Sequence, residues 1–138
     1  MFLGNSFGKT LDIMHRSMDA TMFRRAVIAN NLANSDTPNF KRSTVTFEAE
    51  LKRALESEKR TSIPAALTHR AHIPFERTVD YRDVRPKTQL DYLTTAKNNG
   101  NNVDVEEEMM TALQNQMSYD LMTSYVANQF TQVSMVLR

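Results

Sequence analysis

The 138-residue sequence contains no cysteine, no tryptophan and only three glycines. The absence of cysteine excludes disulfide bonds, thiolate catalysis and cysteine-ligated zinc sites. None of the patterns G-x-x-x-x-G-K, G-x-G-x-x-G or G-x-S-x-G occurs, so phosphate-binding loops and a nucleophilic serine turn are excluded as well. We therefore expect that the protein is not an enzyme and has no catalytic residue, no cofactor and no small-molecule substrate.

An excess of charge of either sign is also missing, since 17 basic and 16 acidic side chains give a formal net charge of +1. A dedicated nucleic-acid binder needs a larger basic excess on one face, so we expect no nucleic acid as a partner. No run of about 18 apolar residues that could span a membrane occurs. The first ten residues lack a basic start and an apolar stretch, and we expect no cleaved signal peptide.

Only one pair of residues has a spacing typical of metal ligands. His69 and His72 are separated by two residues, which occurs in zinc sites. Pro74 follows closely and the sequence offers no evident third ligand. We expect two solvated loop histidines and no metal site.

All four prolines lie between residues 36 and 97, which divides the chain into three parts. Because proline costs about 3 kcal/mol inside a helix, long helices are expected at the two ends. We predict a mainly α fold in which helices within 1–35 and 98–138 pair as a coiled-coil-like rod domain. The middle segment, 36–97, contains the prolines and is predicted to be mostly irregular, with a short helix near 47–55.

The C-terminal stretch is apolar on more than one side. Met110, Leu113 and Met117 form one stripe. A second, rotated stripe consists of Tyr119, Met122, Val126, Phe130, Val133 and Leu137. A single partner helix cannot cover both stripes, so apolar surface is expected to remain available to other chains. Four basic and two acidic groups give residues 1–35 a charge of +2, and one basic and five acidic groups give residues 98–138 a charge of −4. This difference weakly favours pairing of the two ends.

The start of the C-terminal helix has a clear signal in the sequence. Asp104 follows an asparagine-rich turn and Glu107 comes three residues later, as in a capping box. The glutamates at 106–108 are interpreted as the acidic complement of the helix dipole.

The segment from Ala29 to Phe40 is rich in asparagine. A helix end explains Asn34, which tolerates the left-handed conformation, and Pro38, which prevents the helix from continuing. This interpretation leaves Asn30 and Asn31 unexplained. Because a strip of alanines lies beside them, we expect their amides to hydrogen-bond a neighbouring chain.

The segment Asn30-Asn31-Leu32-Ala33-Asn34-x-x-Thr37-Pro38 resembles the N-terminal signature of bacterial flagellar rod and hook proteins. The segment Asn102-Val103-Asp104-x-Glu106, followed by Met109, Asn115, Gln116 and Tyr119, resembles the C-terminal helix of proximal rod members of that family. The resemblance covers roughly residues 5–60 and 98–138. One departure is Asn39-Phe40, where many members have Gly-Tyr, so the turn after Pro38 is expected to differ in shape.

The resemblance implies a structural subunit of the bacterial flagellar basal body that polymerises through its terminal helices into the proximal rod. It also implies export by the flagellar type III apparatus and a place in the rod within the periplasm. The implied partners are other copies of the chain, adjacent FlgC-like rod and FliE-like base proteins, and the export gate. The residues alone leave a cytosolic coiled-coil adaptor open, whereas the −4 charge of the last segment disfavours a membrane-surface binder.

Two sets of functional residues follow from the resemblance and the helix stripes. Phe47 and Leu51 resemble the hydrophobic element by which early flagellar export substrates are recognised, although an ordinary helical pair explains their spacing equally well. The expected assembly interface consists of Ala29, Asn30, Asn31, Leu32, Ala33, Asn34, Thr37, Pro38, Val103, Asp104, Met109, Leu113, Asn115, Gln116, Tyr119, Val126 and Phe130.

Overall fold

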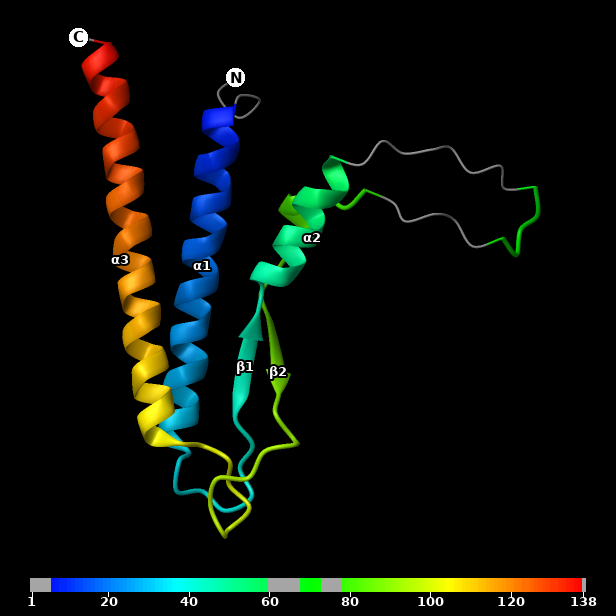
Figure 1. Cartoon of the computed structure of the whole chain (residues 1–138), viewed down its shortest axis with the longest axis vertical. Helices are drawn as coiled ribbons and strands as arrows, with labels where there is room; N and C mark the ends of the chain where they lie inside the picture. Colours follow the sequence, from blue (N-terminus) through cyan, green and yellow to red (C-terminus); the bar gives the residue numbers. More distant parts are fainter. Residues whose placement is uncertain (1–5, 60–67, 73–77, 138) are drawn as a thin grey trace. The chain divides into compact units, whose positions relative to one another are not determined.

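A computed structural model describes residues 6–59, 68–72 and 78–137 and is mainly helical, with long helices at both ends of the chain. The described chain divides into two units, one formed by residues 1–45 and 88–138 and the other by residues 46–87. In chain order the elements are α1 (Ser6–Ala33), β1 (Ser43–Thr46), α2 (Glu48–Glu58), η2 (Tyr81–Asp83), β2 (Lys87–Leu90) and α3 (Val105–Val136), as shown in Figure 1.

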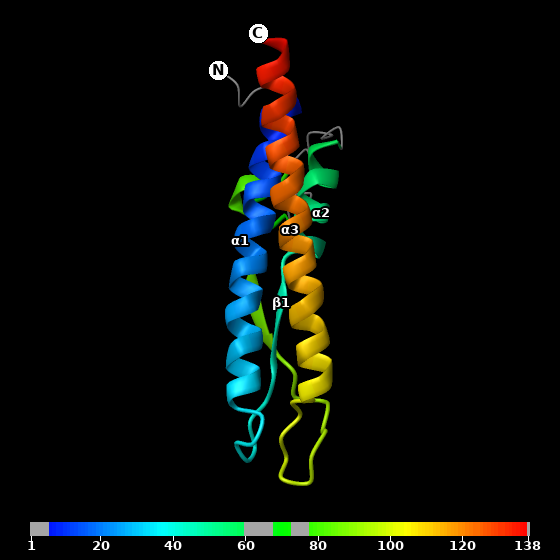
Figure 2. The same ribbon diagram turned by 90° about the vertical axis from the view of Figure 1, so that its left-hand side faces the viewer.

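The first unit is built on α1 and α3, which lie side by side and run in opposite directions (Figures 1 and 2). On α1, the buried side chains include Ala20, Ile28 and Asn31. On α3, Tyr119 and Val126 of the second apolar stripe are half-buried. The stripe that begins at Met110 is exposed, and so are Phe130, Val133 and Leu137 at the end of the second stripe, so α1 leaves apolar surface of both stripes uncovered.

The end of α1 differs in detail from the sequence prediction. Asn34 does not adopt the left-handed conformation. Its side-chain amide donates to the carbonyl of Asn30 at 2.8 Å, which satisfies a carbonyl of the last turn. Among the described non-glycine residues, it is Asn39 that has a positive φ, of 59°. Asparagine tolerates this region better than most other side chains, so the turn after Pro38 is left-handed at Asn39.

A two-stranded sheet forms in the part of the chain that was predicted to be irregular. The Asp91 N–H donates to the Arg42 carbonyl at 3.0 Å, and the Thr44 and Thr46 hydroxyls lie 3.4 Å from the carbonyls of Gln89 and Lys87. Residues further along β1 therefore pair with residues earlier in β2, which shows that the two strands are antiparallel. The prediction missed β1 because four residues are too few for a clear alternation, although Thr44, Val45 and Thr46 are all β-branched.

The second unit contains α2 and η2, which pack against each other. The short helix expected near 47–55 corresponds to α2, which begins one residue later and extends to Glu58. Phe47, Leu51 and Ala54 follow its buried face at spacings of four and three residues. The Ser57 hydroxyl accepts a hydrogen bond from the Val79 N–H at 3.0 Å and so connects the end of α2 to the segment before η2.

Candidate functional site

The asparagine-rich segment that ends α1 and the asparagine-rich segment that precedes α3 meet at one end of the helix pair. We call this the closed end, because α1 ends and α3 begins there (Figure 1). We call the cluster of polar side chains that joins the two segments the clasp. It consists of Asn31, Arg42, Asn101, Asn102 and Glu108.

Asn101 closes the C-terminal end of α1 from a distance of more than sixty residues in the sequence. Its side-chain Nδ2 donates to the carbonyls of Asn34, Ser35 and Thr37 at 2.9, 3.0 and 2.9 Å. Its Oδ1 accepts from the Val103 N–H at 2.6 Å. These three carbonyls belong to the turn that follows α1, so Asn101 fixes that turn from the segment that precedes α3.

Asn102 holds the segment that leads into the sheet. Its Oδ1 accepts from the Arg42 N–H at 2.6 Å, and its Nδ2 donates to the Asp91 carbonyl at 2.7 Å.

The side chain of Asp91 is held by Thr94. A hydrogen bond from the Thr94 hydroxyl is the largest influence on the Asp91 carboxyl and lowers its pKa. Asp91 therefore stays ionised at neutral pH, and its hydrogen bonds with Thr94 weaken only as the pH falls through that lowered pKa.

Asn31 lies on α1 and pairs with the backbone of Ser43 in both directions. Its Nδ2 donates to the Ser43 carbonyl at 2.8 Å, and its Oδ1 accepts from the Ser43 N–H at 3.0 Å. The amide thus bonds to the first residue of β1 as a neighbouring strand would. Asn31 is 1% exposed, so both of these bonds are made within the chain.

Glu108 and Arg42 supply the charges of the clasp. Glu108 is 2% exposed, accepts from Asn31 Nδ2 at 3.2 Å and forms an ion pair with Arg42, whose Nε lies 3.4 Å from Glu108 Oε1. Arg42 Nη1 also lies 2.9 Å from Glu107 Oε2. Burial lowers the pKa of Arg42, but the bond to Glu107 and the nearby carboxylates outweigh burial and raise the pKa above its ordinary value. Arg42 therefore remains charged throughout the neutral range.

A second buried polar contact joins the helices two turns further along α3. Asn115 Nδ2 donates to the backbone carbonyl of Thr21 at 2.9 Å, and both residues are buried.

Asp104 is the N-terminal cap of α3, as the sequence predicted, and its side chain accepts from the N–H groups of Glu106 and Glu107. The expected capping by Asp104 is confirmed.

The surface of α3 that faces away from α1 is strongly apolar. We call it the outer face of α3. The side chains that define it are between 61% and 72% exposed and are Met109, Met110, Leu113, Met117 and Leu121. Burying such side chains contributes roughly 1.5 to 3 kcal/mol each. This face is therefore suited to contact another protein.

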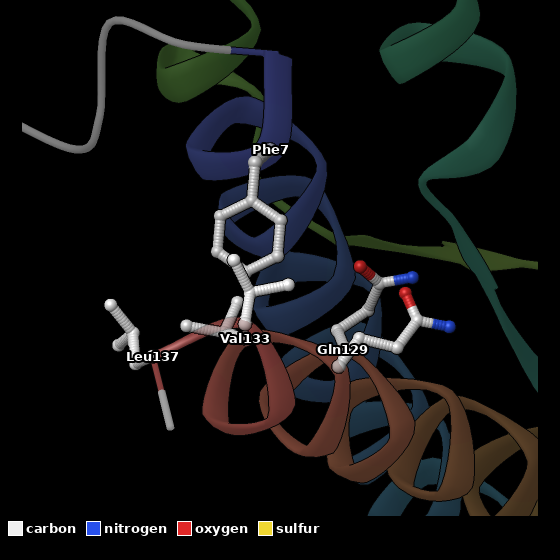
Figure 3. Close-up of a pocket in the computed structure, with 6 residues that line it drawn as sticks. Phe7, Gln129, Val133 and Leu137 are labelled. Carbon is white, nitrogen blue, oxygen red and sulfur yellow. The ribbon is translucent and has the colours of Figure 1, made fainter.

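The helix pair opens at the other end into a shallow apolar pocket of about 290 Å³. Figure 3 shows Phe7 of α1 beside Val133 of α3, with Leu137 and Gln129 at the margins. The described residues that line the pocket are apolar apart from the uncharged amides of two glutamines.

The structure divides the predicted interface residues into three groups by their exposure. The exposed residues are Ala29, Asn30, Ala33, Thr37, Pro38, Asp104, Met109, Leu113, Gln116 and Phe130. The half-buried residues are Leu32, Asn34, Tyr119 and Val126, and the buried residues are Asn31, Val103 and Asn115. The predicted export residues Phe47 and Leu51 are buried in the second unit.

Of the clasp, only Asn31 was predicted as a functional residue. Asn102 was noted only as part of a motif, and Arg42, Asn101 and Glu108 were not predicted. Glu108 was grouped with its two neighbours as a complement to the helix dipole, but its side chain is buried against Arg42 and Asn31. A signal was present, because Glu108 precedes the inward-facing Asn115 by seven residues and so shares its face of the helix.

The described histidines make no metal cluster. His69 and His72 are exposed, with ring centroids 5.8 Å apart. Over the described ranges, no group of three histidine, aspartate or glutamate side chains is arranged to hold a metal ion. In the same ranges, no helix is both long and apolar enough to cross a membrane.

Comparison with known proteins places this architecture in context. A family model described as "Flagella basal body rod protein" matches residues 18–41, which include the asparagine-rich segment. Relatives named flagellar basal body rod protein FlgB are 44% identical in Borrelia hermsii and 40% identical in Borreliella burgdorferi. Each of these alignments covers 97% of this chain and 99% of the relative. A relative of the same name in Bacillus subtilis is 29% identical over 95% of each chain.

Proposed function

Because the chain belongs to the FlgB family of flagellar basal body rod proteins, we propose that its terminal helices polymerise with those of other copies to build the proximal rod. The chain is a structural subunit of the basal body rod and not an enzyme. Membership of this family separates it from the cytosolic coiled-coil adaptor that the helix stripes alone would allow.

The outer face of α3 carries the proposal. Its apolar side chains continue for more than three turns and face away from α1, so α1 cannot cover them. Apolar surface of this extent on a chain of this size is typical of an interface. The exposed part of the expected interface, from Ala29 to Pro38 at the closed end, supplies a second contact region with small and polar side chains.

The buried residues of the expected interface have a different part in the proposal. Asn31 and Val103 are buried at the closed end, and Asn115 is buried between α1 and α3 two turns further along α3. They act on assembly indirectly, because they determine how the exposed residues of α1 and α3 are presented to a neighbouring subunit.

The remaining partners follow from the place of the family in the basal body. The adjacent subunits are FlgC-like rod proteins and FliE-like base proteins, and the chain reaches the rod in the periplasm through the flagellar type III export gate without a cleaved signal peptide. Phe47 and Leu51 serve as the element that the gate recognises before the chain folds, and they pack into the second unit afterwards.

Assembly in cells that lack the endogenous protein tests the proposal. Leu113→Asp places a charge on the outer face of α3 and should abolish rod assembly and motility while leaving secretion of the subunit intact. Thr123→Asp is the control, since it introduces the same charge at an exposed position of the same helix whose neighbours one turn away are not part of the outer face. Normal rods with Leu113→Asp would contradict the proposal.

A further inference from the structure

The seam between α1 and α3 contains polar side chains among apolar ones. On α3, the buried or half-buried positions recur at spacings of three and four residues, as in helices that pack along their length. Apart from Thr111, which is half-buried beside Ala112, these positions are Glu108, Ala112, Asn115, Tyr119, Met122, Val126 and Gln129. The alanine and methionine of this set adapt easily to different neighbours. The apolar side chains alone would therefore tolerate a slip of one helix along the other.

The two buried polar contacts do not tolerate such a slip. Asn115 reaches the Thr21 carbonyl at 2.9 Å, and Glu108 reaches Asn31 Nδ2 at 3.2 Å. A slip of seven residues moves one helix by about 10 Å. In one direction it would bring Glu108 to the level of Thr21, where a buried carboxylate would face a backbone carbonyl.

The stability of the folded chain does not by itself explain an asparagine at position 115. Its Oδ1 is buried and has no hydrogen-bond partner within the part of the chain that the structure describes. A buried acceptor without a partner is unfavourable, and an apolar side chain at this position would avoid that cost. In paired helices, a polar side chain at a core position commonly specifies register at the expense of stability.

We infer that Asn115, together with the Asn31–Glu108 pair, fixes the register of α1 against α3 and prevents the seam from forming slipped or intermolecular pairings. This role is independent of rod assembly, because it concerns the pairing of two helices within one chain. A subunit whose apolar seam paired freely with other copies would associate before it reached its place in a polymer.

Distance measurements between two spin labels test this inference directly, and the chain has no cysteine that would interfere with labelling. Cysteines introduced by Arg25→Cys and Ser118→Cys lie on exposed positions of α1 and α3. In the full-length chain, pulsed electron paramagnetic resonance should give one narrow distance distribution. Asn115→Leu should add a second population shifted by up to about 10 Å, or a fraction of dimer in light scattering, without lowering the unfolding midpoint.

Two further variants make the outcome decisive. Asn128→Leu makes the same substitution at an exposed position of α3 and should keep the narrow distribution. Asn115→Ala removes the hydrogen bond without adding bulk, and it should also broaden the distribution even if Asn115→Leu fails to fold. A single narrow distribution and a monomer with Asn115→Ala would overturn the inference.

Discussion

The three consecutive glutamates at the start of α3 have three different environments. Glu106 is exposed, Glu107 is paired with Arg42 at the surface, and Glu108 is buried against Arg42 and Asn31. Their adjacent positions in the sequence give no indication of this difference. It arises because successive residues of a helix point in directions about 100° apart, and only Glu108 faces α1.

Glu108 should accordingly be the most sensitive of the three to substitution. Glu108→Ala removes the buried carboxylate that both Asn31 and Arg42 contact, and we expect the free energy of unfolding to fall by about 2 kcal/mol. Glu106→Ala is the control and should stay within about 0.5 kcal/mol of the parent chain. Urea unfolding of both variants measures the difference, and equal effects would show that the clasp does not stabilise the fold.

Asn39 offers a second residue-scale prediction, because its φ is 59°. Asn39→Ala should lower the free energy of unfolding by about 1 kcal/mol, since alanine is strained in the left-handed region. Asn39→Gly should be close to neutral, because glycine adopts this conformation readily. Thermal unfolding of the pair checks the prediction, which fails if glycine destabilises the chain as much as alanine does.

Gly100 lies next to Asn39, in the asparagine-rich segment that precedes α3. Its φ is 79°, and a Cβ at this position would lie 2.6 Å from Asn39 Oδ1. The Asn39 N–H donates to the Asn99 carbonyl at 3.0 Å. Glycine at position 100 therefore leaves room for the Asn39 side chain where the two asparagine-rich segments meet.

At the scale of elements, the two long helices could be predicted from the sequence, because proline is absent from both and their apolar residues recur at helical spacing. The cap at Asp104 was also predictable, since it depends on neighbouring residues. The clasp was not, because Asn101 and Asn34 are far apart in sequence and no local pattern indicates which carbonyls a side chain will reach. The β1–β2 pairing was missed for the same reason.

The stability of α3 should vary along its length. Its first part is held by the clasp and by Asn115, whereas Phe130, Met135 and Val136 near its end are exposed. In the dilute free chain, we expect backbone amides near Asn115 to exchange slowly with solvent and those beyond Phe130 to exchange rapidly. Hydrogen exchange followed by NMR measures this gradient. Uniformly slow exchange to Val136 would show that the helix does not depend on assembly for its order.

At the scale of the whole molecule, export and assembly make different demands on the same residues. Phe47 is 2% exposed in the folded chain, so it is accessible to an export gate only before folding. We expect a peptide of residues 42–53 to bind the cytosolic domain of the export gate and to lose affinity with Phe47→Ala. Glu48→Ala is the control, because it changes an exposed neighbour and should bind unchanged.

Secretion in cells extends the same prediction to the full-length chain. Phe47→Ala should lower the amount of subunit secreted by a strain that carries an otherwise intact export apparatus. Secretion at the parent rate, with only assembly impaired, would leave packing within the second unit as the sole role of Phe47.

The central claim is that the outer face of α3 is buried when the subunit polymerises. Electron cryomicroscopy of the assembled rod that contains this chain tests it most directly. We expect Met110, Leu113, Met117 and Leu121 to be covered by side chains of neighbouring subunits, while Asn31 and Glu108 keep their contacts within one chain. A density map in which the outer face of α3 remains exposed to solvent would contradict the account.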